Sequence, residues 1–130
     1  MGTKIVLNFI DAINSADVDR MCDLMSIDHQ FTDSQDHKIT GKENMRQAWI
    51  AYFSLFRDYK IVATDIFEKE GLVCVLGYAS ATYMNLINEN NSNYWRIPAA
   101  WRAFVKDDHI KDWQVYADNI IVMDIINRNK

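Results

Sequence analysis

The sequence predicts an α+β fold in which helices gather on one face of a curved antiparallel sheet. Two observations support this fold class. The first half of the chain carries three stretches with apolar residues three and four apart, the helical spacing, and the second half carries four long strand-like stretches. These strands are joined by short turns rather than by the helical crossovers that parallel strands need. The length of 130 residues suits one core, so we expect a single domain over 1–130.

The predicted helices cover 3–13, 18–25 and 42–58, and the third is the longest. One side of this third helix carries mostly aromatic and other apolar residues: Met45, Ala48, Trp49, Tyr52, Phe53 and Phe56. A strand over 27–33 and a short return strand separate the second helix from the third.

The predicted long strands cover 59–70, 72–84, 94–106 and 110–118. Pro98 falls inside the third of them, where its missing N–H predicts a bulge or a local break. The first half of the tail, 119–130, is too apolar to extend into water. We expect it to form a short helix or a strand, packed on the body or on a partner.

Composition excludes several classes of function. A net charge of −4, with the basic residues scattered, argues against a nucleic-acid partner. No apolar run approaches the ~20 residues of a membrane span, and the N-terminus does not resemble a signal peptide, so we expect a cytoplasmic protein. Cys22 and Cys74 are then expected to be buried, reduced thiols. The three histidines lack ligand spacing, so neither a metal nor another cofactor is expected.

Three stretches, together with the order of elements, carry a family resemblance: "AINSADVDRMCDLMSIDHQFTD" (12–33), "ITGKENMRQAWIAYF" (39–53) and "WQVYAD" (113–118). With them the chain resembles the nuclear transport factor 2-like superfamily, in particular its SnoaL-like branch. The resemblance implies a cone-shaped, cystatin-like sheet with the three N-terminal helices on its concave face, a pocket between sheet and long helix, and a homodimer through the sheet. The superfamily includes isomerases, cyclases, dehydratases, an epoxide hydrolase and non-catalytic binding proteins, so the fold leaves the function open.

Asp33 is the first catalytic candidate. Within the predicted strand 27–33 it shares a face with His29 and with Phe31, which should point inward. The resemblance places Asp33 on the catalytic base of ketosteroid isomerases, and a carboxylate beside apolar walls gains a raised pKa suited to acid–base chemistry. We therefore expect it to lie mostly out of water inside the cone. The alternative is a carboxylate that caps the turn after the strand.

Isomerase activity itself is not implied. The helix tyrosine that donates to the oxyanion in these enzymes corresponds to Phe9, and their second acid falls on or near Ala100. Without such donors a base loses a large share of its catalysis.

Asp118 ends the last strand, where the SnoaL-like branch often has an acid, so it is the second catalytic candidate; a structural cap is the alternative. His29 is expected at the surface or the pocket rim. The ligand-binding candidates are Phe9, Tyr52, Phe56, Tyr78, Trp101 and Tyr116.

The sequence thus predicts a small soluble protein with an aromatic-lined pocket for a small hydrophobic molecule. As an enzyme, it would be a cofactor-free acid–base isomerase, cyclase, dehydratase or hydrolase. The alternative is a non-catalytic ligand-binding or dimerisation module.

Overall fold

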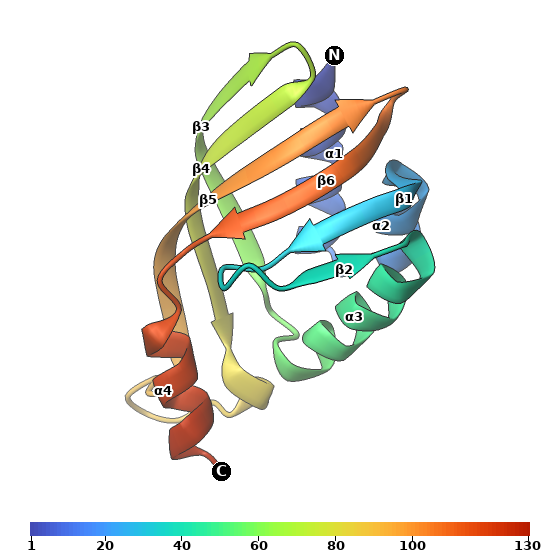
Figure 1. Cartoon of the computed structure of the whole chain (residues 1–130). Helices are drawn as coiled ribbons and strands as arrows, with labels where there is room; N and C mark the ends of the chain where they lie inside the picture. The colour runs from blue at the N-terminus through green and yellow to red at the C-terminus, as the bar shows by residue number, and fades with distance from the viewer.

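The computed structural model describes residues 1–130 and confirms the α+β class (Figure 1). Every predicted element is present, and the tail forms a helix. The elements are α1 (Gly2–Asn14), α2 (Val18–Leu24), β1 (Met25–Thr32), β2 (Lys38–Thr40), α3 (Lys42–Leu55), β3 (Lys60–Lys69), β4 (Leu72–Thr82), a 3-10 turn (Tyr83–Asn85), β5 (Tyr94–Lys106), β6 (His109–Tyr116) and α4 (Ile120–Arg128).

The six strands form one sheet in the order β2-β1-β6-β5-β4-β3. All neighbouring pairs are antiparallel except β1 and β6, which run parallel, with Phe31 opposite Trp113. The sheet is therefore mixed, and the expectation of a wholly antiparallel sheet is wrong at this one pair. These two strands lie about eighty residues apart in the sequence, so no turn between them fixes their direction.

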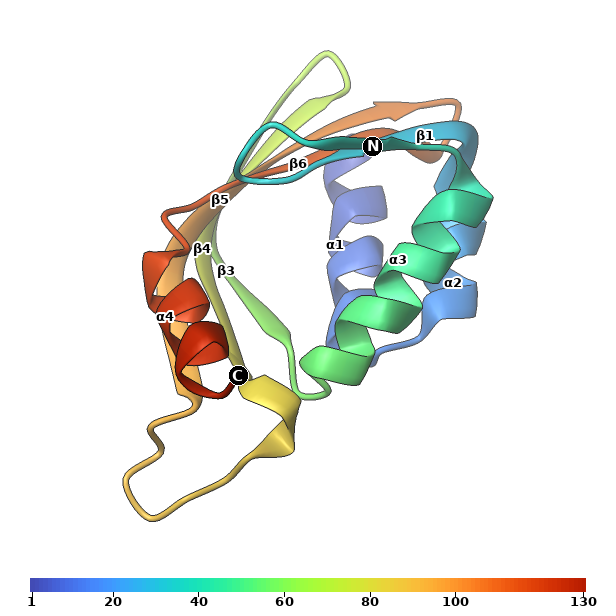
Figure 2. The ribbon, with the colours of Figure 1, turned by 60° about the horizontal axis from the view of Figure 1, so that its bottom comes forward.

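The sheet curves around the helices, and α1 lies across its concave side with α2 and α3 beside it (Figure 2). Asn14, at the end of α1, anchors this arrangement. Its side chain donates to the Ile61 carbonyl oxygen at 3.0 Å and accepts from the Ile61 N–H at 2.8 Å. Between helices and sheet lies one apolar core, in which Phe9, Trp101 and Trp113 are almost completely buried.

A bulge interrupts the pairing of β3 with β4, and bulges of this kind bend a strand. The register between β3 and β4 shifts between Ala63 and Asp65, which leaves Thr64 as an extra residue. Gly77 faces this bulge, and a Cβ there would lie 1.9 Å from the Val62 carbonyl oxygen. Only glycine permits so close an approach of the two backbones.

Pro98 does not break its strand. It pairs with Tyr78 in an uninterrupted β4–β5 register, whereas pairing between β5 and β6 begins only at Ala100 and Tyr116. At Pro98 the β6 side of the strand is therefore an edge, where a residue without an N–H costs no ladder hydrogen bond. The expected bulge is absent for this reason.

The helix α4 packs against the lower end of the curved sheet (Figures 1 and 2). It buries Val122 and Ile125. Two polar contacts tie its end to the preceding Asn-rich loop: Arg128 donates to the Ser92 carbonyl oxygen, and the Asn129 amide donates to Asn93 Oδ1 at 2.8 Å. No helix of the structure has both the length and the apolar character to span a membrane.

Candidate functional site

An apolar cavity of about 430 Å³ lies between the concave sheet, α3 and α4. This volume is in the usual range for small-molecule sites. Twenty of its 23 lining residues are hydrophobic, and no lysine or arginine is among them. The walls come from β1 and the turn after it, β2, α3 and the turn before β3, β4, β5, β6 and α4, so the cavity exists only in the complete fold. We take this cavity as the candidate functional site.

Aromatic rings form the wall of the cavity below α3, and Tyr59 stands at their centre. Its ring centroid is 5.1 Å from that of Tyr52, 6.4 Å from that of Trp49 and 6.2 Å from that of Trp95. Phe56 joins them, with its centroid 5.6 Å from Trp95 and the two rings edge to face. We call these five residues the aromatic wall. Such contacts hold the rings in place by about 0.5–1.5 kcal/mol per pair beyond burial alone.

The polar atoms of the aromatic wall are hydrogen-bond donors that stay protonated. Burial raises the pKa of Tyr59 well above its ordinary value, and burial, followed by the charge of Tyr59, does the same for Tyr52. The indole nitrogens of Trp49 and Trp95 are buried and have no acceptor. Both indole N–H groups are thus covered by neighbouring side chains and do not open onto the cavity.

Asp33 lies at the rim of the cavity and caps a turn. Its Oδ1 accepts from the backbone N–H groups of Gln35 and His37, both at 2.9 Å, and Oδ2 is 3.3 Å from His37 Nδ1. Its side chain is 38% exposed. The carboxylate thus bonds to its own turn at the partly exposed rim, as the capping alternative expects, and does not lie deep inside the cone. The strand β1 ends at Thr32, so the alternation that aligned Asp33 with Phe31 stops one residue before it.

Asp118 is exposed and outside the cavity. Its Oδ1 accepts from the N–H of Ile120, the first residue of α4, at 3.1 Å, although the N-cap position itself is Asn119. The two acids proposed for catalysis thus do not converge on the cavity, and each bonds to the backbone of its own turn.

The six ligand-binding candidates divide into three groups. Tyr52, Phe56 and Trp101 line the cavity. Phe9 does not line it and is fully buried in the core, where its ring meets that of Trp113 at 5.0 Å. Tyr78 and Tyr116 point from the outer face of the sheet, away from the cavity.

On that outer face, the guanidinium of Arg96 lies 3.7 Å from the ring centroid of Tyr78, and Tyr116 is half exposed. The strand β4 carries apolar residues on both faces, so alternation alone does not tell which way Tyr78 turns. In β6, by contrast, Trp113 and Val115 alternate with polar residues, and this pattern places Tyr116 on the outer face.

His29 is fully buried, not at the surface or the rim. Its Nδ1–H donates to the Ile110 carbonyl oxygen at 2.7 Å, and its Nε2 has no partner. Burial lowers the pKa of this ring because the protonated form would lose its hydration. Of the two cysteines, both free, only Cys22 is buried; Cys74 is exposed on the outer sheet face, contrary to expectation.

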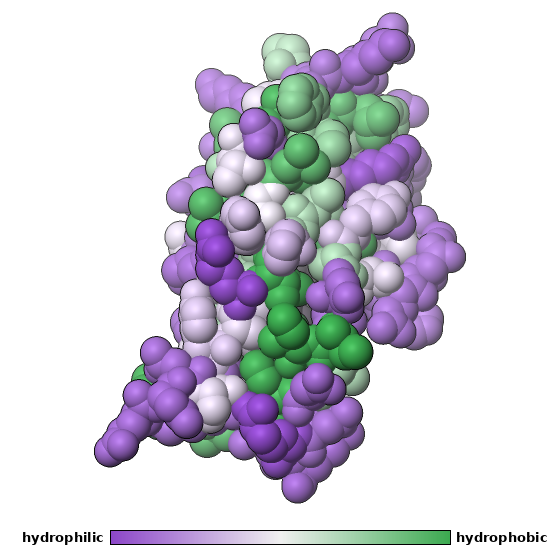
Figure 3. Space-filling model, turned by 90° about the vertical axis from the view of Figure 1, so that its left-hand side faces the viewer, coloured by the Kyte–Doolittle hydropathy of each residue, from purple (hydrophilic) through white to green (hydrophobic).

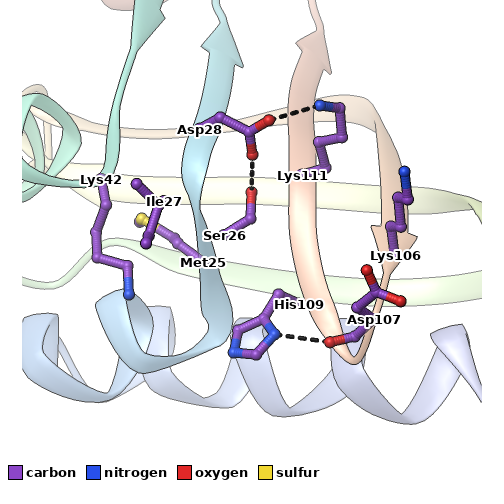
Figure 4. Close-up of a pocket in the computed structure, with 9 residues that line it drawn as sticks. All are labelled: Met25, Ser26, Ile27, Asp28, Lys42, Lys106, Asp107, His109 and Lys111. Atoms are coloured by element: carbon purple, nitrogen blue, oxygen red, sulfur yellow. Dashed lines mark hydrogen bonds and ion pairs between the residues drawn. The ribbon is translucent and has the colours of Figure 1, made fainter.

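A second recess, of about 480 Å³, lies where β1 meets the β5–β6 hairpin (Figure 4). One ion pair lies in it, between Lys111 and Asp28 at 2.8 Å, and Asp28 also accepts from the hydroxyl of Ser26 at 2.9 Å. His109 Nδ1–H donates to the carbonyl oxygen of Asp107 beside it. These are surface groups without convergent buried donors, so this recess is not our candidate.

Sequence reasoning missed three members of the aromatic wall as ligand contacts: Trp49, Tyr59 and Trp95. A signal was present for Trp49, which precedes Tyr52 by three residues and Phe56 by seven and thus lies on the same helical face. Tyr59 lies two residues before Ile61, which points inward, so strand alternation would also point Tyr59 inward. However, it lies in the turn before β3, where side chains need not alternate.

Comparisons with known proteins agree with this architecture. A family model described as the SnoaL-like domain matches residues 6–113. No curated protein sequence matches the chain. Among solved structures, the chain is similar to a protein from Shewanella denitrificans assigned as a SnoaL-like polyketide cyclase, at 14% identity and a TM-score of 0.81, over 98% of this chain and 97% of that one.

It is also similar to an epoxide hydrolase of M. tuberculosis, at 14% identity and a TM-score of 0.80, over 98% of this chain and 90% of the other. A third is a protein of ketosteroid isomerase-like fold from Catenulispora acidiphila, in complex with trimethylamine. It has 14% identity and a TM-score of 0.75, over 86% and 83% of the two chains. At such identities these likenesses establish the fold alone. The family model covers most of the chain, from α1 into β6, and by that match the chain belongs to the SnoaL-like domain family.

Proposed function

We propose that this chain is a non-catalytic binding protein for a small, mainly apolar molecule, held in the cavity between the sheet, α3 and α4. The observation that carries the proposal is the lining: 20 hydrophobic residues of 23 around a volume of about 430 Å³. An unfilled apolar cavity costs stability, because its walls lose the contacts that close packing would give. A ligand restores these contacts.

The state of the two acids supports binding without acid–base catalysis. The carboxylate of Asp33 is held by two backbone N–H groups of its own turn, and Asp118 faces solvent outside the cavity. A general base needs a carboxylate oxygen within reach of the substrate proton in a water-poor site. Among the solved structures above, one carries a hydrolase name and another binds an amine, so relatives of this fold differ in what they do.

The test uses the four tryptophans, because all of them line the cavity: Trp49, Trp95, Trp101 and Trp113. N-phenyl-1-naphthylamine, an uncharged apolar fluorophore, should quench their emission through energy transfer at saturable, micromolar concentrations. The variant Ala48→Phe fills the cavity from α3 and should weaken binding at least tenfold. Ala51→Phe is the matched control, since Ala51 lies on the exposed side of the same helix. Equal binding by both variants would refute the cavity as the site.

For the assembly, we propose a homodimer through the outer face of the sheet. Figure 3 looks onto this side of the molecule, where apolar side chains form a band between charged margins. Exposed apolar residues from neighbouring strands meet there, namely Val62, Phe67, Leu72, Leu76 and Tyr116. Patches of this kind on soluble proteins mark interaction sites.

A second copy of the chain is the proposed partner because the patch spans the four strands β3 to β6; a standard interface would bury about 800 Å² per partner. Light scattering at micromolar concentration should give twice the chain mass of 15.2 kDa. A monomer mass would contradict the dimer while leaving ligand binding untouched.

A further inference from the structure

The few polar residues of the cavity lining indicate which head group the ligand carries on its apolar body. This inference rests on the proposed binding function and asks which class of molecule the cavity selects. Three of the 23 lining residues are not hydrophobic: Asp33, Ser34 and Asn119. Each of them has a side-chain oxygen that accepts hydrogen bonds, and each is only partly buried. The lining thus combines an apolar interior with three acceptors that water reaches.

These three residues meet at the same edge of the sheet. Asp33 and Ser34 directly follow β1, and Asn119 lies between the end of β6 and the start of α4. The two strands pair side by side and run parallel, with Thr32 opposite Gln114, so their ends point the same way (Figure 1). The three polar residues therefore form one group, which we call the polar rim, where the cavity opens to water.

The polar rim holds acceptors that the chain leaves free. Oδ1 of Asp33 binds its own turn, whereas Oδ2 has no backbone partner and lies 3.3 Å from Nδ1 of His37, an exposed ring. Asn119 stands at the N-cap of α4, yet its side chain makes no capping hydrogen bond. Asp33 Oδ2 and the amide oxygen of Asn119 are therefore free to bind a ligand.

Charge decides which head group suits the polar rim. Asp33 is the only charged residue in the cavity lining, which has no lysine or arginine. The carboxylate of Asp118 binds the first N–H of α4 and offsets the positive end of the helix dipole beside the rim. An anion would meet these carboxylates without a countercharge. An ammonium group would pair with Asp33 while part of it stays in water.

We propose that the cavity binds an apolar alkylamine, whose body fills the apolar interior and whose protonated nitrogen lies at the polar rim. The ammonium group donates hydrogen bonds to Asp33 Oδ2 and to the amide oxygen of Asn119, with the Ser34 hydroxyl as a third acceptor. Asp33 then has two separate tasks, since Oδ1 caps the turn and Oδ2 binds the ligand. This role involves no proton transfer.

The experiment compares three probes that differ only in the head group on the same naphthylethyl body. They are 2-(2-naphthyl)ethylamine, 2-(2-naphthyl)ethanol and 3-(2-naphthyl)propanoate: a cation, a neutral molecule and an anion at neutral pH. Each is titrated as a competitor that displaces N-phenyl-1-naphthylamine. The wild-type protein should bind the amine about three- to tenfold more tightly than the alcohol, as expected for one charge-assisted hydrogen bond at a partly exposed site. The propanoate should bind most weakly.

Two matched variants test the carboxylate. Asp33→Asn keeps an oxygen for the turn but loses the charge, so it should bring the preference for the amine over the alcohol to about one. Asp36→Asn removes the same charge from the same turn but lies outside the cavity, so it should keep the preference. Uncharged N-phenyl-1-naphthylamine should bind equally to both variants, and thermal melting verifies that both fold.

Nuclear magnetic resonance gives a second measurement that needs no variant. The amide signals of Gln35 and His37, whose N–H groups bond to Asp33, should shift more at saturation with the amine than with the alcohol. Equal shifts with the two probes would overturn the inference. So would a wild-type protein without preference for the amine, an Asp33→Asn variant that keeps the preference, or an Asp36→Asn variant that loses it equally. In these cases the proposed binding function stands, whereas it falls too if N-phenyl-1-naphthylamine does not bind the wild-type protein.

Discussion

The turn after β1 offers a direct test of what Asp33 does. In the structure its Oδ1 accepts two backbone N–H groups, from Gln35 and His37, both at 2.9 Å. A capping carboxylate typically stabilises its turn by about 1 kcal/mol, and the second bond adds little here because the side chain is 38% exposed and water can replace it. Asp33→Ala should therefore lower the free energy of unfolding by about 1 kcal/mol.

Urea denaturation followed by circular dichroism measures this loss. With a slope of about 1.5 kcal/mol per molar urea, the midpoint should fall by roughly 0.7 M. Asp33→Asn keeps a side-chain oxygen for both N–H groups and should shift the midpoint by less than half as much. Asp124→Ala, at an exposed position of α4, is the control and should leave it unchanged.

The capping role would be refuted if Asp33→Ala kept full stability. A tenfold loss of N-phenyl-1-naphthylamine binding in Asp33→Asn, without loss of stability, would return this residue to the functional site.

The remaining predictions concern the core and the assembly. Burial lowers the pKa of His29, so near pH 6.5 the unfolded chain binds a proton that the folded chain does not bind. The free energy of unfolding should therefore be constant above about pH 7. Below pH 6.5 it should fall by at most about 1.4 kcal/mol per pH unit. Between pH 7 and 5.5 the free energy of unfolding should fall less steeply in His29→Asn than in the exposed-site control His109→Asn. Equal slopes in the two variants would exclude His29 as the cause of the pH dependence. Leu76→Lys, on the outer sheet face, should give a monomer mass by light scattering. The control Ile50→Lys, on the outside of α3, should keep the dimer mass. A dimer mass in both variants would place the interface elsewhere.

The fold could be predicted in detail because its elements carry strong local patterns. The strand β5 was expected over 94–106 and is found at Tyr94–Lys106, and the helical stripes of α1 and α3 face the core as their spacing indicates. The parallel pairing of β1 with β6 could not be predicted. Strand direction follows from how distant segments meet, and the local pattern of neither strand contains it.

The site was predicted only in part. Tyr78 and Tyr116 were placed in the pocket, yet they face outward. In β4 the even positions Leu72 and Leu76 are as apolar as the odd position Val73, so the pattern does not place Tyr78. In the sequence, the residues of a sheet face that packs against a partner show the same apolar pattern as those of a face that packs against the core. The alternation of β6 did indicate an outward Tyr116, and the expectation did not follow it. His29 shows the opposite error. Its parity with Phe31 pointed inward, and a polar side chain was nevertheless expected at the surface.

The aromatic wall explains why this fold keeps a cavity at all. The sheet bends at Thr64 and Gly77 and leaves a conical space on its concave side. Flexible aliphatic side chains would fill such a space by changing rotamers. Here the space under α3 is bounded by rings that brace one another at centroid distances between 4.9 and 6.4 Å. Each ring is held by its neighbours, so none is free to collapse inward, and the unfilled volume persists. The same bracing fixes the shape of the cavity before a ligand arrives, and such preorganisation lowers the entropic cost of binding.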